Sequence, residues 1–380
     1  MRIQRSLAFC LVVGVLLATE IRATGNNAPN NPADAPEVKL TIPSVKSANG
    51  VFRVIAPAES SKVLRDLEPG ENTLKKGEWL DFFFTYPKAD NRDGLKTVAT
   101  IASRLWSATF ANLSDTDLAE LKNLIELRSL GCAVDRKGTG SGLEVASTLT
   151  HLEVMNVELA NAQACLGVKH IANVKCLKQL ILQFDSKCPE EALDPLADHK
   201  SLNALTVKNW NGLTDAGMAK IAKIPNLATL DVNQCTKITA KGIEALKGRR
   251  LRDLDIRGCD RISDDGAKHI ATFSELRNLF AQASGMTDVG VKLIAGLKQL
   301  ETLDLSDNFG VTDTCMEDLK ALKSLKILNV SGTELTDKAV VALKEMQTLT
   351  ELNVEATRIS VAGVEALKKA LPNTKINEVQ

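Results

Sequence analysis

The 380-residue chain has few aromatic residues and no net charge. Phe, Trp and Tyr make up 4% of the sequence, and 47 basic residues balance 47 acidic ones. Nucleic-acid binding needs a net or clustered positive field, so the balance argues against nucleic acid as a partner. Scarce aromatic residues favour a stack of thin layers over one large globular core.

Groupings of catalytic or metal-ligating residues are also lacking. The four histidines lie in separate segments, at His151, His170, His199 and His269. No nucleophile, base and orienting group approach each other along the chain. The glycine-rich segment 137–142 lacks the Gly-Lys-Ser/Thr ending of a phosphate-binding loop. We therefore expect no enzyme activity, no catalytic residues, no metal site and no cofactor.

No apolar run is long enough to span a membrane. The run from Leu7 to Ala18 has twelve residues, against the roughly 20 that a spanning helix needs. Arg2 and Arg5 precede it, so residues 1–23 are predicted to be a secretory signal peptide cleaved after Ala23. We expect a secreted, periplasmic or cell-envelope protein without a membrane span after cleavage. The alternative is an uncleaved signal that anchors the chain.

The next two segments differ from each other in composition. Residues 24–37 have no apolar period and are predicted to be a flexible linker. Residues 38–92 are β-rich and include the aromatic segment from Trp79 to Tyr86, with three short strands expected. They form either an N-terminal cap over the open end of a repeat core or a small independent domain.

Residues 93–380 repeat one pattern, of which Leu300-Glu301-Thr302-Leu303-Asp304-Leu305 is a clear copy. Each copy fits one strand plus one returning helix. The first leucines of the copies are Leu127, Leu149, Leu177, Leu202, Leu227, Leu251, Leu276, Leu300, Leu325 and Leu349, with a degenerate earlier copy at Leu105, Ala108 and Phe110.

A hydroxyl residue, often followed by Asp, precedes most of the expected helices. Thr287-Asp288 and Thr312-Asp313 are examples. The hydroxyl would cap the helix, and the Asp would complement the dipole of that helix. A glycine three residues after the cap, such as Gly290, would let adjacent helices pack closely.

The pattern L-x-x-L-x-L-x-x-C/N/T-x-x-I-T-D-x-G resembles the cysteine-containing leucine-rich repeat of F-box proteins and of many secreted bacterial proteins. The resemblance is specific over residues 202–371 and departs from the family pattern at residues 132–188. It implies an α/β fold, a right-handed leucine-rich repeat solenoid (horseshoe) of about eleven repeats. Parallel strands would line the concave face and helices the convex face. The implied role is protein binding.

Cysteines divide into two groups on this pattern. Cys132, Cys235, Cys259 and Cys315 fall at core positions and are interpreted as small apolar fillers. Cys165 and Cys188 lie in equivalent loops of adjacent repeats, so a disulfide between them is possible in an oxidising compartment.

Strand alternation predicts which residues face a partner. Leu303 should point inward and Asp304 outward, so that Asp304→Ala should cost almost nothing. Phe280 is the unusual member of the outward row, and we expect it to be an exposed contact anchor. The alternative is that it fills a local packing defect beside the small Ala281. The predicted ligand-binding residues are Ile181, Phe184, Asp231, Asp255, Arg257, Asn278, Phe280, Gln282 and Asp304.

Two functional hypotheses follow. The first is a non-catalytic extracytoplasmic scaffold whose concave face binds a protein or peptide. The alternative is an envelope or cell-surface accessory protein. In that case the aromatic segment from Trp79 to Tyr86 recognises a carbohydrate or an enzyme partner, and the repeats act as a spacer.

Overall fold

The computed structural model describes residues 37–42, 50–56, 62–67, 70–84, 104–185 and 187–378. The chain divides into two compact units, residues 1–111 with 120–130, and residues 112–119 with 131–380. The predicted signal peptide, nearly all of the linker and the first expected repeat helix lie outside the described residues. None of the described helices is long and apolar enough to cross a membrane.

The first unit is built mainly from antiparallel strands. Strand β2 (Gly50–Ala56) pairs antiparallel with β3 (Lys62–Leu67) and with β5 (Trp79–Phe84), and β5 pairs parallel with β6 (Leu105–Leu113). A separate pair joins β1 (Val38–Ile42) to β4 (Gly70–Leu74). The expectation of three strands before residue 92 was wrong, because the described residues of this segment already form five. Strands β3 and β4 are rich in polar residues, so their apolar alternation is weak.

Aromatic residues of β5 belong to the core of this unit. Trp79 and Phe82 are buried. The Phe82 ring lies 5.7 Å from that of Phe110, and the Trp79 ring packs edge-on 5.3 Å from that of Trp106. These two side chains therefore stabilise the unit and do not form the exposed recognition surface that the alternative hypothesis expected. Tyr86 lies outside the described residues.

The second unit, which we call the repeat unit, alternates short strands with helical return segments. Its strands are β7 (Ser129–Val134), β8 (Val154–Leu159), β9 (Gln179–Phe184), β10 (Ala204–Val207), β11 (Thr229–Asp231), β12 (Asp253–Asp255), β13 (Asn278–Phe280), β14 (Thr302–Asp304), β15 (Ile327–Asn329), β16 (Glu351–Asn353) and β17 (Lys375–Asn377). Two residues of β7 belong to the first unit.

The return segments are α-helices or short 3-10 helices. The α-helices are α3 (Asp115–Ala119), α4 (Ala162–Cys165), α5 (Val168–Ile171), α6 (Asp215–Ile221), α7 (Ala240–Glu244), α8 (Ser263–Ile270), α9 (Asp288–Ile294), α10 (Met316–Leu319), α11 (Ala339–Leu343) and α12 (Val361–Ala370). The 3-10 helices are η5 (Ser141–Thr148), η6 (Glu190–Leu196) and η7 (Asp313–Cys315), with η4 (Glu120–Asn123) in the first unit.

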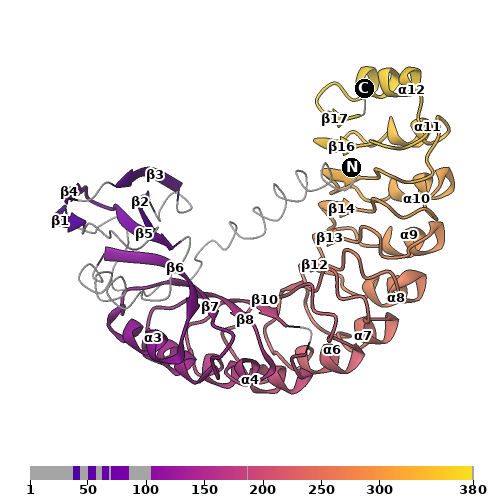
Figure 1. Cartoon of the computed structure of the whole chain (residues 1–380). Coiled ribbons are helices and arrows are strands. Elements are labelled where there is room, and N and C mark those ends of the chain that lie inside the picture. Colours follow the sequence, from indigo (N-terminus) through magenta and orange to yellow (C-terminus); the bar gives the residue numbers. More distant parts are fainter. Residues whose placement is uncertain are drawn as a thin grey trace. The chain divides into compact units, whose positions relative to one another are not determined.

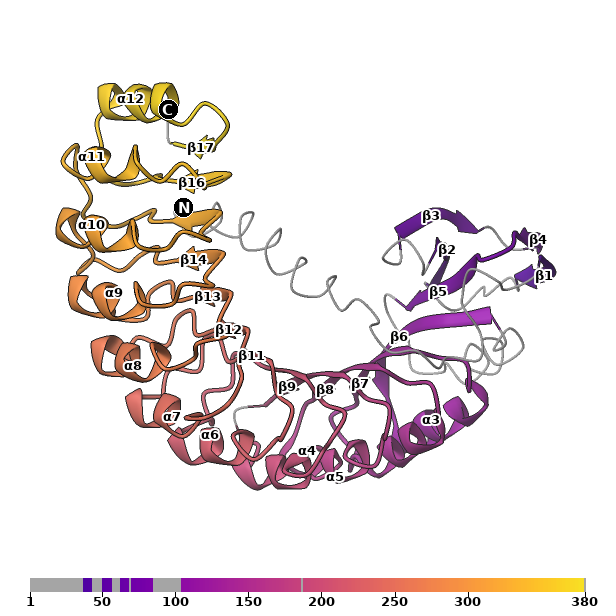
Figure 2. The ribbon, with the colours of Figure 1, turned by 180° about the vertical axis from the view of Figure 1, so that it is seen from behind.

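Strands β8 to β17 pair in parallel, each with the next. Within the repeat unit the strands line the inner side of the curve and the helices cover the outer side (Figures 1 and 2). Leu279, Leu303 and Leu328 stand in register on neighbouring strands and are fully buried. The α/β solenoid that the repeat predicts is confirmed.

The register predicted for the repeat of β8 was wrong. Met155 aligns with Leu180 across β8 and β9, so the first leucine of that repeat is Leu152, not Leu149. Leu152 lies 25 residues from both Leu127 and Leu177, which makes the spacing regular. Leucines three residues apart fit the same pattern, and Leu149 instead closes the return segment η5.

Two buried thiols contact backbone carbonyls at the ends of neighbouring strands. Cys235 Sγ contacts the carbonyl of Val207 at 3.3 Å, and Cys259 Sγ contacts that of Val232 at 3.3 Å. Burial raises the pKa of both thiols to about 12, so both stay protonated at neutral pH. Cys132, Cys235, Cys259 and Cys315 are all buried and free, as expected of core fillers.

Carboxylates tie most return segments to the next. Asp264 of α8 accepts hydrogen bonds from the N–H of Thr287 (2.8 Å), the hydroxyl of Thr287 (2.6 Å) and the N–H of Gly290 (2.9 Å), all in the following repeat. A Cβ on Gly290 would lie 2.4 Å from Asp264 Oδ1, so this glycine makes room for the carboxylate. The Asp therefore stabilises the next helix as well as complementing the dipole of its own.

We call this arrangement the inter-repeat tie. In each case the carboxylate accepts the backbone N–H and the hydroxyl of the cap residue at 2.6–3.0 Å. The pairs are Asp115–Thr139, Glu190–Thr214, Asp215–Thr239, Asp264–Thr287, Asp288–Thr312, Asp313–Thr336 and Asp337–Ser360.

Besides the step from η5 to α4, where Asn161 Nδ2 donates to the carbonyls of Arg136 and Gly138 at 3.2 and 3.0 Å, two steps of the described solenoid lack a carboxylate tie. Ala240 stands where the other repeats have an acid, and α8 accordingly has no side-chain cap; Ser263, at φ 53°, donates its N–H to the carbonyl of Ser284 instead. At the other step Cys165 and Cys188 form a disulfide, with Cα atoms 5.9 Å apart and a sequence separation of 23. Asp264 and Thr287 have the same separation, so the disulfide links consecutive repeats at the same interval.

Candidate functional site

The residues predicted to face a partner form one row across neighbouring strands. Asp231, Asp255, Phe280 and Asp304 occupy equivalent positions of β11, β12, β13 and β14. Adjacent strands lie about 4.8 Å apart, so these side chains are neighbours on one face of the sheet. We call these four residues the concave row.

The expected exposure of Phe280 was wrong. Only 3% of the residue is accessible, and the Arg257 guanidinium lies over its ring, 5.5 Å from the centroid. Because neighbouring strands lie this close, a long side chain on one strand can cover a side chain on the next strand. Burial beside the small, buried Ala281 fits the alternative interpretation, in which Phe280 fills a local space.

Asp255 holds Arg257 in this place. Its carboxylate receives the Arg257 Nε–H at 2.9 Å and 3.0 Å, a further bond from Nη2, and the Arg257 backbone N–H at 3.1 Å. Asp255 is buried, and Arg257 keeps part of its side chain at the surface. A buried, two-pronged ion pair fixes the guanidinium, so Arg257 is the positioned cation of the site.

Asp304 is also buried, contrary to the exposed position expected for it. It accepts the backbone N–H of Ser306 at 2.9 Å and the Ser306 hydroxyl at 2.6 Å. Burial raises the pKa of its carboxyl, and the bonds from Ser306 partly offset this. Removing the acceptor would leave buried donors unsatisfied, at about 1–3 kcal/mol. The expectation that Asp304→Ala costs almost nothing was therefore wrong.

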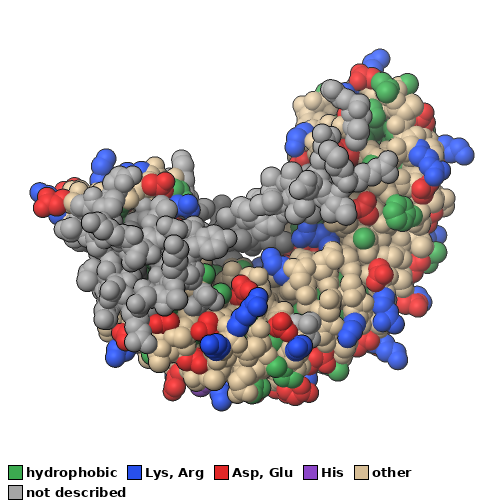
Figure 3. All heavy atoms as spheres, in the orientation of Figure 1, with side chains coloured by type: hydrophobic (Ala, Val, Ile, Leu, Met, Phe, Trp, Pro, Cys, Tyr) green, Lys and Arg blue, Asp and Glu red, His purple; other side chains and the backbone are tan. Residues whose placement is uncertain are grey.

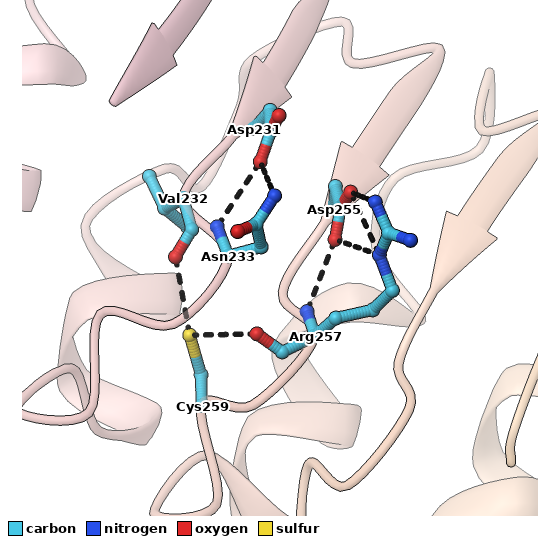
Figure 4. A network of polar contacts seen from close by, with 6 residues as sticks. All are labelled: Asp231, Val232, Asn233, Asp255, Arg257 and Cys259. Carbon is cyan, nitrogen blue, oxygen red and sulfur yellow. Dashed lines mark hydrogen bonds and ion pairs between the residues drawn. The ribbon is translucent and has the colours of Figure 1, made fainter. Parts of the chain in front are cut away.

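Asp231 is the half-buried acid of the row (Figure 4). Its Oδ1 accepts the backbone N–H and the side-chain Nδ2–H of Asn233, at 3.1 and 2.8 Å. Burial, and next the neighbouring charge of Asp255, raise the pKa of Asp231 to about 7; Asn233, Arg257 and Lys208 act in the opposite direction. The charge of this carboxyl therefore changes near neutral pH.

Asn278 and Gln282 bond to flanking carboxylates. Asn278 Nδ2 donates to Asp253 at 2.5 Å, and Gln282 Nε2 donates to Asp307 at 2.7 Å. Both side chains remain half-buried at the surface beside Phe280. They are therefore positioned polar groups within reach of a partner.

The second predicted apolar pair does not form a joint surface. Ile181 is half-buried in the same strand position as Thr206, which places it outward. Phe184 is buried and packs against the Trp210 ring, with centroids 4.4 Å apart. Phe184 lies three residues after Ile181, so strand alternation places the two side chains on opposite faces.

The surface of the site suits polar and ionic contacts. Figure 3 shows basic and acidic side chains interspersed on the visible face, with hydrophobic side chains in scattered spots. Within the described ranges no group of three His, Cys, Asp or Glu residues could hold a metal ion. The sequence-based reasoning missed the Arg257–Phe280 stack. Arg257 lies two residues after Asp255, on the same face and one strand from Phe280, so strand register could have revealed it.

Comparisons with known proteins agree with the fold. The profile of the Leucine Rich repeat family matches residues 223–247, 250–271 and 321–344. The complex of Rad7 and Elc1 from yeast contains a chain with a TM-score of 0.57 at 17% identity, over 77% of this chain and 79% of that one. An internalin of Listeria monocytogenes is similar at a TM-score of 0.41, with 18% identity over 75% of this chain and 70% of that one.

Two curated relatives are plant F-box proteins. F-box protein MAX2 of Arabidopsis thaliana is 27% identical over 180 residues, 44% of this chain and 26% of that protein. F-box protein MAX2 homolog A of Petunia hybrida is 27% identical over 261 residues, 62% of this chain and 35% of that protein. The chain thus spans about a quarter to a third of the length of these relatives.

Proposed function

We propose that this leucine-rich repeat chain is a non-catalytic scaffold that binds a protein partner through the inner face of its repeat unit. The observation that carries the proposal is the fixed polar surface around the concave row. Buried Asp255 and Phe280 hold Arg257 in place, and half-buried Asp231, Asn278 and Gln282 surround it. Groups held in position before binding lose little conformational freedom when a partner arrives.

The chemistry of this surface favours a polar protein segment over a small molecule. Arginine is enriched where proteins bind one another, and its guanidinium offers several donors in a fixed plane. The carboxyl of Asp231 lies one strand away and accepts hydrogen bonds. A partner that presents both an acceptor and a donor would match this pair.

The test is affinity capture from the native extracellular fraction, with the secreted chain as bait. Asp231→Asn and Gln282→Ala together should lower partner recovery while the chain stays folded at the capture temperature, because both side chains are partly exposed and neither supports the core; circular dichroism checks the fold. The matched control is Asp265→Asn on α8, an exposed acid that forms an ion pair with Lys268. Equal recovery of the partner by the double variant and the control would contradict the proposal.

An extracytoplasmic location is part of the proposal and is supported by the N-terminal sequence, in which Arg2 and Arg5 precede the apolar run from Leu7 to Ala18. The F-box relatives suggest a different cellular context for the same scaffold role. Mass spectrometry of the protein recovered from its native source distinguishes these contexts. A mature chain that begins at Thr24 supports secretion, whereas an intracellular chain that retains Met1 or Arg2 contradicts it.

A further inference from the structure

One edge of the repeat unit is strongly basic although the whole chain is neutral. At this edge each return segment turns into the following strand. The turn before β12 reads Lys247-Gly248-Arg249-Arg250-Leu251-Arg252, and Gly248 adopts φ 83° there. Four of these six residues are basic, and all four retain side-chain exposure.

Neighbouring repeats extend this positive charge. The Arg277 N–H donates to the carbonyl of Arg252 at 2.7 Å, so these residues start adjacent strands side by side. On the other side, Lys223 occupies the place of Lys247 in the preceding turn, 24 residues earlier. We call Lys223, Lys247, Arg249, Arg250, Arg252 and Arg277 the basic edge.

Few carboxylates balance the basic edge. Lys223, Lys247 and Arg252 are exposed and have no ion-pair partner within the described part of the chain. Arg249 donates to the carbonyl of Ile224 at 3.4 Å.

The two remaining arginines have loose or shared partners. Arg250 lies 3.6 Å from Glu275 with 86% of its side chain accessible. Arg277 pairs at 2.8 Å with Glu301, which Lys326 shares at 2.6 Å. Within the described residues the six basic groups form ion pairs with two acids, Glu275 and Glu301, so most of the positive charge remains available.

We propose that the basic edge binds a short acidic segment of a protein partner. Guanidinium groups bind carboxylates with two parallel hydrogen bonds. The edge crosses three adjacent repeats, about 10–15 Å at the strand spacing, which an extended segment of roughly three to five residues would span. This site is separate from the concave row.

Charge distribution favours an acidic peptide over a nucleic acid. Glu275 and Glu301 flank the basic edge on the side of β13 and β14. A nucleic acid carries a phosphate at every step and gains affinity from many contacts, so it would meet these acids beyond the patch. The neutral balance of the chain argues against a nucleic acid, and the concentration of positive charges on one edge still suits a short anionic segment.

The proposal is tested with a fluorescein-labelled twelve-residue peptide rich in Asp and Glu, measured by fluorescence anisotropy with the full chain. Lys247→Glu, Arg250→Glu and Arg252→Glu together should raise the Kd at least tenfold, and added salt should weaken wild-type binding. The matched control carries Lys237→Glu, Lys241→Glu and Lys292→Glu, the same charge change at exposed sites off the edge. Its Kd should change less than twofold.

A second variant, a control at the concave row and two competing ligands test the same proposal. If the triple Glu variant has a lowered melting temperature, the corresponding Gln variant replaces it and should still raise the Kd several-fold. Asp231→Asn should leave peptide binding unchanged, which separates this site from the proposed function. Undetectable binding, equal loss in the control, or tighter binding of a single-stranded oligonucleotide or an anionic phosphatidylserine vesicle at the same ionic strength would overturn the proposal.

Discussion

The regular repeats after residue 202 and the irregular repeats between Cys132 and Cys188 share one core but differ in how consecutive repeats are joined. In the regular region, carboxylates such as Asp288 bond the cap residue of the next helix. In the irregular region, the Cys165–Cys188 disulfide joins consecutive repeats at the same interval. Consecutive repeats are therefore joined by more than one chemistry, and the step at Ala240 folds without a carboxylate tie.

The largest effect should be the same in both regions, because it concerns the shared core. Leu303 and Leu180 occupy equivalent strand positions and are fully buried. Leu303→Ala and Leu180→Ala should each lower the free energy of unfolding by about 2–5 kcal/mol. Urea unfolding followed by circular dichroism measures both. A loss below about 1 kcal/mol at either position would show that the core is not equivalent.

Breaking the disulfide should affect only the irregular region. Replacing Cys165 and Cys188 with Ser should lower stability by about 3 kcal/mol, the value for a loop of this length. Hydrogen exchange should accelerate in β8 and β9 and stay unchanged in β13 to β15. Thiol titration of the denatured, unreduced chain cleaved after Ala23 should find five free thiols; seven would exclude the bridge.

Removing a carboxylate tie should have a smaller effect in the regular region. Asp264→Ala should cost about 1–3 kcal/mol, because the Thr287 and Gly290 donors lose their acceptor. The adjacent Asp265→Ala is the control. Asp265 is exposed and forms an ion pair with Lys268. Asp265→Ala should therefore change the free energy of unfolding by no more than about 0.5 kcal/mol. Equal losses would mean that the tie does not stabilise the joint.

Adding the carboxylate that is missing at Ala240 should raise the stability of the chain modestly. Ala240→Asp places a carboxylate at the position that Asp215 and Asp264 hold in other repeats, and should raise stability by up to about 1 kcal/mol. Ala216→Asp, at an exposed site in the first turn of α6, adds the same charge to a helix start without adding a tie. If both variants stabilise equally, the helix dipole alone explains the gain.

The last prediction concerns the pH dependence of the concave row. Asp231 has a raised pKa of about 7, so the folded state retains a proton that the unfolded state loses above pH 4. Stability should therefore fall as pH rises from about 4 to 7. Asp231→Asn should flatten this part of the profile of melting temperature against pH. An unchanged slope would show that Asp231 does not titrate in this range.

Periodicity made the solenoid and its strand row predictable, but contacts between repeats were not. The pattern placed Asp255, Phe280 and Asp304 on one face correctly. Strand register places Arg257 beside Phe280, but alternation within one strand does not show that the guanidinium covers the ring, because burial in a solenoid depends on the neighbouring repeat as much as on alternation. For the same reason, the Asp after each cap was predicted to act only on the dipole of its own helix. Leu149 was predicted as the first leucine of its repeat in place of Leu152 because both residues fit the pattern.

The inter-repeat ties also determine how such a chain can change length during evolution. Each carboxylate lies 23 or 24 residues before the cap that it supports. Duplication or deletion of one whole repeat, wherever it begins, therefore brings an acid and a hydroxyl back to the same interval and preserves every joint. A loss such as that at Ala240 is confined to one joint. Insertions of any other length would separate donor from acceptor, so growth by complete repeats is the tolerated route.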